Sequence, residues 1–401
     1  MRALFLTLTT CVLIVPVQAK YGGGTGKPND PYLISTAEQM NTIGTNPNDW
    51  DKHFKLMADI DLSRFTGDAF NIIGYWFDSF DNKPFRGVFD GGGKKISDFS
   101  YASDRNAIAL FGYVDDPNAE IRYLGLIDPN VEATAVKSVS VGSLVGLLGG
   151  GTITGCYAEG SSVAGDNHVG GLVGYNRGKN TTYASSGSIS ETGYNVSGMV
   201  GYNPGTITDC HSSGGVWGNG EGVGGLVGSS EGPISNCYAT ASVSGDEEVG
   251  GLVGFGDCAI SNCYCEAIVS GNDYIGGLVG WNHGTITNCY STGGSISGNR
   301  YIGGLVGYNG YRGTVIDSFW DVEVSGQTTS NGGTGKTTAE MKRESTFVDA
   351  GWDFVEIWGI GENQTYPYLR VYPAGDLNHD GRLDLLDLAE LANNWLAGVS
   401  N

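Results

Sequence analysis

The sequence is short of basic residues. Lys and Arg number 22 against 43 Asp and Glu, which gives a formal net charge of −21. Proteins that bind nucleic acid carry patches of positive charge, so this balance argues against a nucleic-acid partner. An acidic balance is typical of a soluble extracellular protein, and it favours the binding of cations.

Metal-binding pairs of cysteines are also missing. The chain has no Cys-x-x-Cys, and its five histidines show no ligand spacing, so a zinc site is not expected. Strands stacked in register lie about 4.8 Å apart, whereas a disulfide prefers Cβ atoms about 3.8 Å apart. We therefore expect buried, unbridged thiols for the five cysteines that share one slot of a repeat: Cys156, Cys210, Cys237, Cys263 and Cys289. Cys258 and Cys265 lie outside this slot and could form one local bridge.

Beyond its first residues the chain has no apolar run of the roughly 20 residues that a membrane span requires. The N-terminus combines Arg2, an apolar run from Ala3 to Val17 and the small-residue cleavage signal Val17-Gln18-Ala19. This pattern predicts a secretory signal peptide over residues 1–19, the alternative being a membrane helix. We expect a secreted protein, or one on the extracellular surface, with no membrane span.

What the sequence has in quantity is repetition. Seven near-copies of a Gly-Leu-Val-Gly phrase recur at steps of 26 to 28 residues, a period that marks a stacked repeat architecture. Each unit contains two or three short runs of β-forming residues bounded by turn residues. The sequence therefore predicts an all-β fold, a parallel β-helix with about one coil per repeat. We expect one buried column for the apolar anchors: Leu144, Leu172, Met199, Leu226, Leu252, Leu278 and Leu305.

Two further slots flank the cysteines. The preceding slot carries Asp209, Asn236, Asn262, Asn288 and Asp317, whose side chains are predicted to bond the backbone of the next coil at a bend. The following slot carries Tyr157, Tyr183, His211, Tyr238, Tyr264, Tyr290 and Phe319, predicted to form an outward aromatic ladder. Flat rings stack on sugars and tyrosine keeps a polar handle, so we expect glycan contact at Tyr238, Tyr264 and Tyr290. The alternative is that the ladder only stabilises neighbouring coils.

The flanks of the repeats are predicted to cap a solenoid, whose open ends would otherwise pair with other molecules. A capping box at Ser35 to Glu38 predicts a helix that ends near Gly44, and Thr337 to Ser345 predicts another. Trp352, Phe354 and Trp358 are expected to plug the open end. The predicted parts are a signal peptide (1–19), an N-terminal cap with irregular first coils (20–109), the repeats (110–330), a C-terminal cap (331–373) and a calcium-loop module (374–401).

The phrase Gly-Gly-Leu-Val-Gly followed by Asn-Cys-Tyr-Ser-Thr-Gly, as in Gly276 to Gly293, resembles the GLUG repeat of bacterial secreted and surface proteins. The resemblance covers roughly Leu144 to Phe319. It implies a β-helix in an extracellular setting, often on adhesin-like proteins. It implies no catalytic residues.

The C-terminal run Asp376-Leu-Asn-His-Asp-Gly-Arg-Leu-Asp-Leu-Leu-Asp387 resembles the calcium loop of a type I dockerin repeat, an EF-hand-type loop. The resemblance implies Ca²⁺ held by the side chains of Asp376, Asn378, Asp380, Asp384 and Asp387 and by the carbonyl of Arg382. An amphipathic helix from Leu385 to Leu396 would follow. A full dockerin has two such loops and this chain has one, so the resemblance implies calcium binding without docking to a cohesin-type partner.

These patterns favour a non-enzymatic, monomeric surface or matrix protein for adhesion or glycan contact, with a calcium-binding tail. The alternative is a polysaccharide-degrading enzyme, a lyase or glycosidase on a β-helix. Such an enzyme needs clustered acids or a basic residue in one groove. The coil slots instead show Tyr, Thr, Ser and Asn, so no catalytic residue is assigned. A third reading is a rod that only spaces the tail from the cell.

Overall fold

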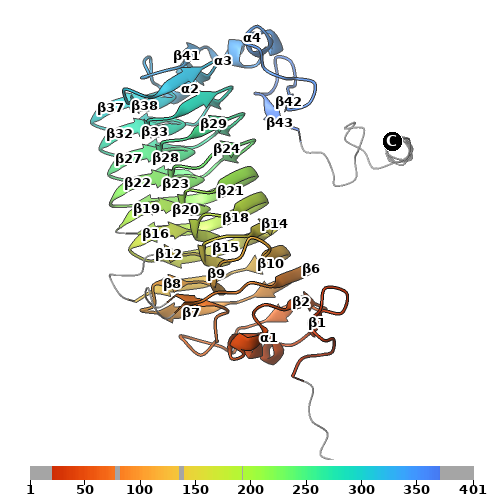
Figure 1. Ribbon diagram of the computed structural model, residues 1–401. Coiled ribbons are helices and arrows are strands. Elements are labelled where there is room, and N and C mark those ends of the chain that lie inside the picture. Colours follow the sequence, from red (N-terminus) through yellow and green to blue (C-terminus); the bar gives the residue numbers. More distant parts are fainter. Residues whose placement is uncertain (1–19, 77–81, 135–139, 192, 371–401) are drawn as a thin grey trace, which may run out of the picture.

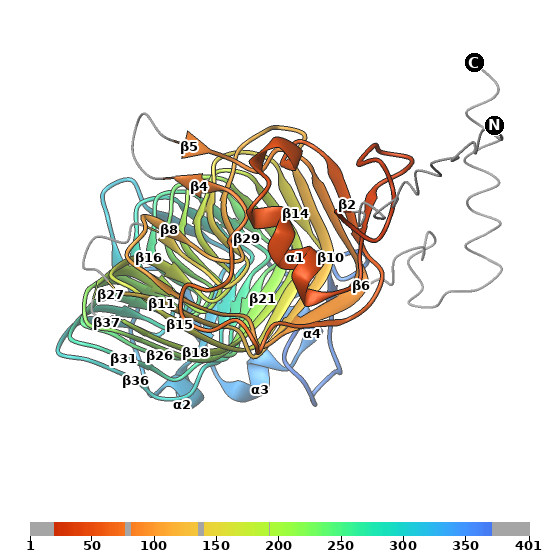
Figure 2. The same cartoon turned by 90° about the horizontal axis from the view of Figure 1, so that it is seen from below.

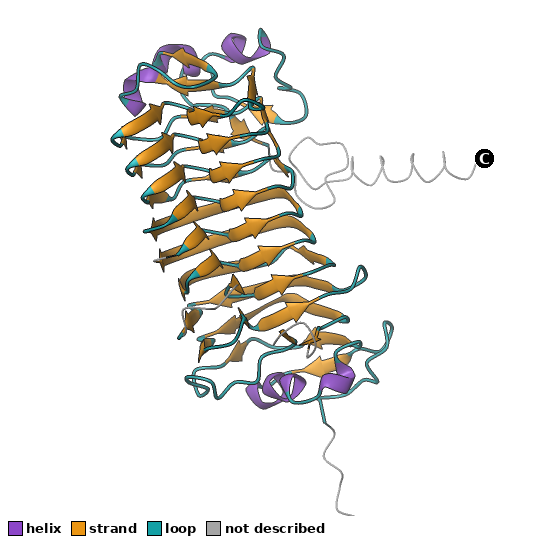
Figure 3. Cartoon of the chain, turned by 60° about the vertical axis from the view of Figure 1, so that its left-hand side comes forward, coloured by secondary structure: helices purple, strands orange, loops and turns teal. Residues whose placement is uncertain are grey.

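The computed structural model describes residues 20–76, 82–134, 140–191 and 193–370. The described chain forms a parallel β-solenoid, in which successive coils stack as layers with short helices near both ends (Figures 1 and 3). This confirms the predicted fold class. The predicted signal peptide and the calcium-loop module lie outside the described residues.

Two eight-stranded sheets form two faces of the solenoid, and each coil contributes one strand to each sheet. The first sheet contains β8 (Ala107–Ile108), β12 (Ser140–Val141), β16 (Asn167–Gly170), β19 (Tyr194–Ser197), β22 (Glu221–Gly224), β27 (Glu247–Gly250), β32 (Asp273–Gly276) and β37 (Arg300–Gly303). The second contains β9 (Phe111–Val114), β13 (Val145–Leu148), β17 (Val173–Asn176), β20 (Val200–Asn203), β23 (Val227–Ser230), β28 (Val253–Gly256), β33 (Val279–Asn282) and β38 (Val306–Asn309).

The remaining side of the solenoid is a 23-stranded sheet that bends within each coil. Its first strands are β1 (Tyr32–Ile34), β2 (His53–Leu56), β3 (Ile60–Asp61), β6 (Val88–Ser97), β7 (Ser100–Ser103), β10 (Glu120–Ile127), β11 (Asn130–Ala133), β14 (Thr152–Thr154), β15 (Tyr157–Ala164), β18 (Lys179–Glu191) and β21 (Thr206–Gly218). The rest are β24 (Ile234–Ser235), β25 (Tyr238–Ala239), β26 (Ser242–Ser244), β29 (Ala259–Ser261), β30 (Tyr264–Cys265), β31 (Val269–Ser270), β34 (Thr285–Thr287), β35 (Tyr290–Ser291), β36 (Ile296–Ser297), β39 (Thr314–Ile316), β40 (Phe319–Asp321) and β41 (Thr334–Lys336).

The apolar anchors of the repeat form the predicted buried column, each with no exposed surface. Backbone hydrogen bonds join them from coil to coil, as from the amide of Leu278 to the carbonyl of Leu305 at 2.8 Å. The glycines of the phrase are required by close backbone approach. A Cβ at Gly280 would lie 2.6 Å from the backbone of Glu248 and Val249. The repeated phrase therefore encodes the tightest turn of each coil.

The slot before the cysteines adopts a left-handed backbone, with φ between +45° and +56° from Asp209 to Asp317. Its side chains bond one another rather than the backbone of the next coil, which corrects that expectation. The amide of Asn236 donates to Asp209 Oδ1 at 3.1 Å, and that of Asn262 donates to Asn236 Oδ1 at 3.3 Å. Stacking in register places the amides directly above one another, so the nearest partner is the neighbouring amide.

The seven cysteines among the described residues are buried and free. This confirms the prediction of an unbridged column. The suggested bridge between Cys258 and Cys265 does not form. Cys265 Sγ faces the backbone of Gly251 in the core, whereas Cys258 lies at the turn beside Gly284, so the two thiols serve different parts of the coil. Burial raises the pKa of the Cys156 thiol to about 12.

Helix α1 (Ala37–Gly44) lies across the N-terminal end, as the view along the solenoid shows (Figure 2). Its N-cap is Thr36, not Ser35, because the Thr36 hydroxyl accepts the amide of Gln39. A short 3₁₀ helix (Pro47–Asp49) and the pair β4 (Tyr75–Trp76) and β5 (Asn82–Lys83) complete this end.

The C-terminal segment runs through α2 (Val322–Ser325), α3 (Thr338–Met341), α4 (Glu344–Val348), β42 (Trp358–Gly359) and β43 (Tyr368–Leu369). The single helix predicted from Thr337 to Ser345 is thus two short helices, although Thr337 does form a capping box with Glu340. β42 and β43 lie beside the coils rather than on the last one (Figure 1). Within the described ranges, no helix is long and apolar enough to cross a membrane.

Candidate ligand-contact surfaces

The first surface is the predicted ladder after the cysteine slot, here named the cap-side ladder. Its rungs in register are Tyr157, Ala184, His211, Tyr238, Tyr264, Tyr290 and Phe319. Ala184 occupies the rung that was predicted for Tyr183, because Tyr183 pairs with Cys210 and so stands in the cysteine slot. That unit lacks a cysteine, and the shift by one residue cannot be read from its sequence.

The rings of the cap-side ladder stack face to face. The centroids of His211, Tyr238, Tyr264 and Tyr290 are 4.8, 4.9 and 5.1 Å apart in turn, with interplanar angles of 3°, 6° and 1°. Both faces of Tyr238 and Tyr264 are therefore occupied by neighbouring rungs. Such rings present their edges to the surface, and a sugar that stacks on a ring needs a free face.

The C-terminal segment also covers the upper part of this ladder. Trp352 and Trp358 contact Tyr290 at centroid distances of 6.2 and 6.0 Å. The Tyr290 hydroxyl donates to the carbonyl of Pro367, and the Tyr290 side chain is fully buried, while Tyr264 is 9% exposed. The expectation that Tyr264 and Tyr290 are open to a glycan is therefore wrong, and Tyr238 alone of the three remains half-buried. Trp352 and Trp358 cover this side of the solenoid instead of plugging its end.

Below the covered part, a groove of about 620 Å³ opens between the coils and the C-terminal segment. The coils contribute Tyr157, Glu159, Ala184, Asp209, His211, Asn236 and Tyr238 to its lining. The C-terminal segment contributes Glu356, Ile357, Leu369 and Arg370.

A second aromatic column runs along the sheet from β9 to β38, and sequence analysis missed it. Its positions in register are Tyr113, Leu147, Tyr175, Tyr202, Ser229, Phe255, Trp281 and Tyr308. The signal was present, because the residue that follows each Gly-Leu-Val-Gly phrase is aromatic in most copies. Attention to the cysteine slot hid it.

At the upper end of this column, rings from three neighbouring slots gather into a surface that we name the open aromatic patch. Its members are Phe255, Tyr274, Trp281, His283, Tyr301, Tyr308 and Tyr311. Tyr301 is 48% exposed and Tyr311 is 85% exposed. Trp281 meets Tyr308 edge to face, with a centroid distance of 5.1 Å and an interplanar angle of 79°. Edge-to-face packing leaves ring faces available at the surface.

The patch owes its shape to the corner residues beside it. Tyr274 and Tyr301 adopt left-handed backbones with φ of 59° and 54°, and their rings stack at 5.0 Å. Arg300, between them and the solvent, pairs with the buried carboxylate of Asp273. The indole Nε1 of Trp281 is buried and has no hydrogen-bond partner among the described residues. The patch is thus aromatic and rigid, with one unmatched donor.

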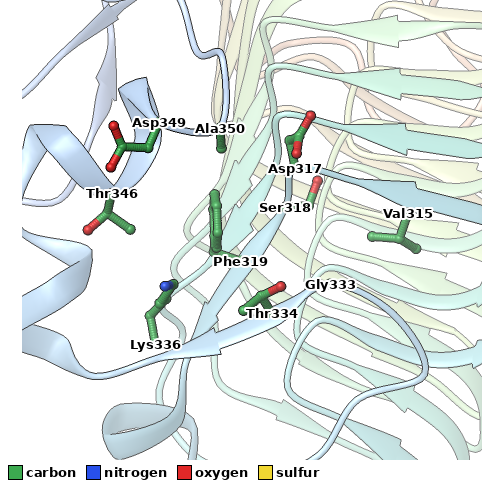
Figure 4. A pocket seen from close by; sticks show the side chains of 10 residues that line it. All are labelled: Val315, Asp317, Ser318, Phe319, Gly333, Thr334, Lys336, Thr346, Asp349 and Ala350. Carbon is green, nitrogen blue, oxygen red and sulfur yellow. The ribbon is translucent and has the colours of Figure 1, made fainter.

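A smaller pocket of about 380 Å³ lies where the last coil meets the C-terminal segment (Figure 4). Lys336 extends its ammonium group beside Phe319, 6.0 Å from the ring centroid, and Thr346 and Asp349 line the helical side. Across the described part of the chain, no group of three or more His, Cys, Asp or Glu side chains is placed to hold a metal ion.

Comparison with known proteins finds the GLUG motif at residues 219–244 and 271–297, which confirms that the chain carries GLUG repeats. A protein from Evansella cellulosilytica, provisionally named a Gly-rich membrane protein, is 49% identical over 72 residues, which are 17% of this chain and 8% of that protein. Halomucin from Haloquadratum walsbyi is 32% identical over 155 residues, 38% of this chain and 2% of halomucin. The chain therefore spans only a small part of the length of these relatives.

Among solved structures, a protein from Bacteroides ovatus that is provisionally named an immunoglobulin A1 protease matches 88% of this chain and 95% of its own. The sequence identity is 20% and the TM-score is 0.43, too low for any argument to rest on this likeness.

Proposed function

We propose that the protein is an exported, non-enzymatic surface or matrix component that contacts glycans through the open aromatic patch. The observation that carries the proposal is the exposed edge-to-face array around Trp281, Tyr301 and Tyr308 on a rigid solenoid. Aromatic rings with free faces and polar tips suit sugars, which are apolar on one face and carry hydroxyls at the rim. The GLUG repeats and relatives with names such as halomucin support a surface setting.

The test is a glycan array with residues 20–401, run beside an assay for reducing-sugar release. Replacing the two most exposed rings, Tyr301→Ser with Tyr311→Ser, is expected to weaken binding about tenfold or more, which corresponds to about 1.4 kcal/mol. Tyr123→Ser is the matched control, because Tyr123 is 53% exposed and lies on the bending sheet, outside the patch. Equal binding by the double variant and the wild type would rule out the patch. Release of reducing sugar would favour the enzymatic alternative.

We also propose that the C-terminal tail binds Ca²⁺ through Asp376, Asn378, Asp380, Asp384 and Asp387, with the carbonyl of Arg382. From Asp376 to Glu390 there are five acids and one arginine, a net of 5 − 1 = 4 negative charges. Crowded carboxylates are relieved by a cation that takes six to eight oxygen ligands. Supporting evidence is the sequence alone, since this stretch lies outside the described residues.

Calorimetry on residues 20–401 tests the calcium proposal. We expect one Ca²⁺ to bind with measurable heat, and the variant that combines Asp376→Ala with Asp380→Ala to lose that heat. Asp166→Ala is a suitable control, because Asp166 belongs to a loop of the solenoid. If the double variant binds Ca²⁺ as well as the wild type, the site lies elsewhere. If the wild type gives no heat, the tail is not a calcium module.

A further inference from the structure

The cap-side ladder has one rung without a ring. Ala184 stands between Tyr157 and His211, so the stack of rings is interrupted there. One face of the His211 imidazole packs on Tyr238, with centroids 4.8 Å apart, and its other face looks toward Ala184. The ladder therefore ends in a ring face that no ring of the described chain is recorded to cover.

Tyr157 does not fill the gap. Its ring leans away over Gly125 in the coil below, where a Cβ would lie 2.5 Å from Tyr157 Cζ. Two strand spacings of about 4.8 Å separate the rungs of Tyr157 and His211, which is the room that one planar or near-planar ring takes in such a stack. The groove of about 620 Å³ opens at this gap.

The rim of the groove is rich in hydrogen-bond acceptors. Glu159 and Asp209 are exposed carboxylates from the coils, and Asn236 adds an amide that donates to Asp209 at 3.1 Å. The guanidinium of Arg370 is occupied, because it donates to the carbonyls of Trp358 at 2.7 Å and Phe354 at 3.0 Å. The groove thus combines a free ring face, apolar walls and a negatively charged rim.

We propose that this groove binds one pyranose ring of a neutral or amino sugar, which takes the place of the missing ring and stacks on His211. The apolar face of the sugar covers the imidazole, and its hydroxyls or ammonium group donate to Glu159 and Asp209. Like charge excludes uronic acids. The same repulsion excludes the chain's own acidic segment, residues 371–401, as the occupant. This inference rests on the proposed glycan-binding function but assigns a second site, separate from the open aromatic patch.

The decisive variant is Ala184→Phe, which supplies the missing ring from the protein itself. The probes are cellohexaose, chitosan hexamer and oligogalacturonate, titrated into residues 20–401 and followed by calorimetry and by the imidazole proton signals of His211. We expect cellohexaose or chitosan hexamer to bind and to shift the His211 signals, and oligogalacturonate to do neither. Ala184→Phe should weaken the binding at least tenfold while its melting temperature stays equal or rises, because the added ring completes the stack.

His211→Ala provides a second variant that adds no bulk, and it should also weaken the binding at least tenfold. The patch variant, Tyr301→Ser with Tyr311→Ser, should keep the His211 shifts, so failure of the patch and failure of the groove are distinguishable. Wild-type binding by Ala184→Phe, preferential binding of oligogalacturonate, or no binding of either neutral or amino probe would overturn the proposal. Tighter binding after truncation at Arg370 would show that residues 371–401 occupy the groove, and would also overturn it.

Discussion

The cap-side ladder and the open aromatic patch are both columns of rings produced by the same repeat, yet they have opposite properties. In the ladder the rings lie parallel, within 6° of one another from His211 to Tyr290, and the C-terminal segment covers the upper rungs. In the patch, Phe255, Trp281 and Tyr308 meet at 64° and 79° and stay at the surface. An aromatic residue in a repeat slot therefore does not define a binding face. Ring orientation and coverage decide whether the ring is structural or available.

The difference arises from the neighbours of each slot. The ladder rungs follow the left-handed bend and have only each other beside them, so the coil spacing sets a parallel stack. The patch rings stand next to a second aromatic column at the corner, and Tyr274 packs against Trp281 at a centroid distance of 4.7 Å. Two adjacent columns of rings cannot all stack in parallel, and the edge-to-face arrangement resolves the crowding.

The largest expected effect comes from removing a covered ring. Tyr290→Ala should destabilise the protein by about 3–5 kcal/mol, as large buried aromatic truncations do. It removes the stack with Tyr264, the contacts with Trp352 and Trp358 and the hydrogen bond to Pro367. Tyr301→Ala in the patch should change stability by no more than about 0.5 kcal/mol, as surface substitutions usually do. Urea denaturation followed by tryptophan fluorescence measures both. Equal losses in the two variants would abolish the distinction between a structural ladder and an available patch.

A smaller effect, of up to about 3 kcal/mol for each group, is expected from two corner residues on the open side. Burial lowers the pKa of His168 to about 4, while burial and the carboxylates of Glu221 and Glu247 raise the pKa of Glu248 to about 7. For His168, the unfolded chain takes up a proton between pH 6.5 and pH 4 and the folded chain does not. Stability from this group is therefore complete above pH 6.5 and is lost as the pH falls.

Glu248 works in the opposite direction. The folded chain keeps its proton between pH 4.5 and pH 7 and the unfolded chain loses it, so stability falls as the pH rises through this window. Relative to the wild type, His168→Gln should gain stability on going from pH 7 to pH 4. Glu248→Gln should gain stability on going from pH 4.5 to pH 7. Urea midpoints at the two ends of each window measure the changes, and parallel pH curves for wild type and variants would contradict both assignments.

Much of the solenoid was predictable because a period of 26 to 28 residues leaves few ways to bury the anchor from Leu144 to Leu305. The free cysteines followed from strand spacing for the same reason. The register around Ala184 was not predictable, since the unit with Tyr183 lacks the cysteine that marks the slot. The burial of Tyr290 was not predictable either. It depends on where residues 338–370 pack, and the period of the repeat carries no information about a segment outside it.

The C-terminal segment also determines how the molecule carries a load. It covers rungs contributed by successive coils, from Tyr238 to Phe319, and brings Leu369 and Arg370 beside His211. In a stacked solenoid each coil contacts only its neighbours, so a pull on the last coil would unwind the stack from its end. Tension on the chain at Arg370 instead enters beside the coils of His211 and Tyr238. The segment acts as a strain relief, and it must peel from the side of the rod before any coil is pulled out.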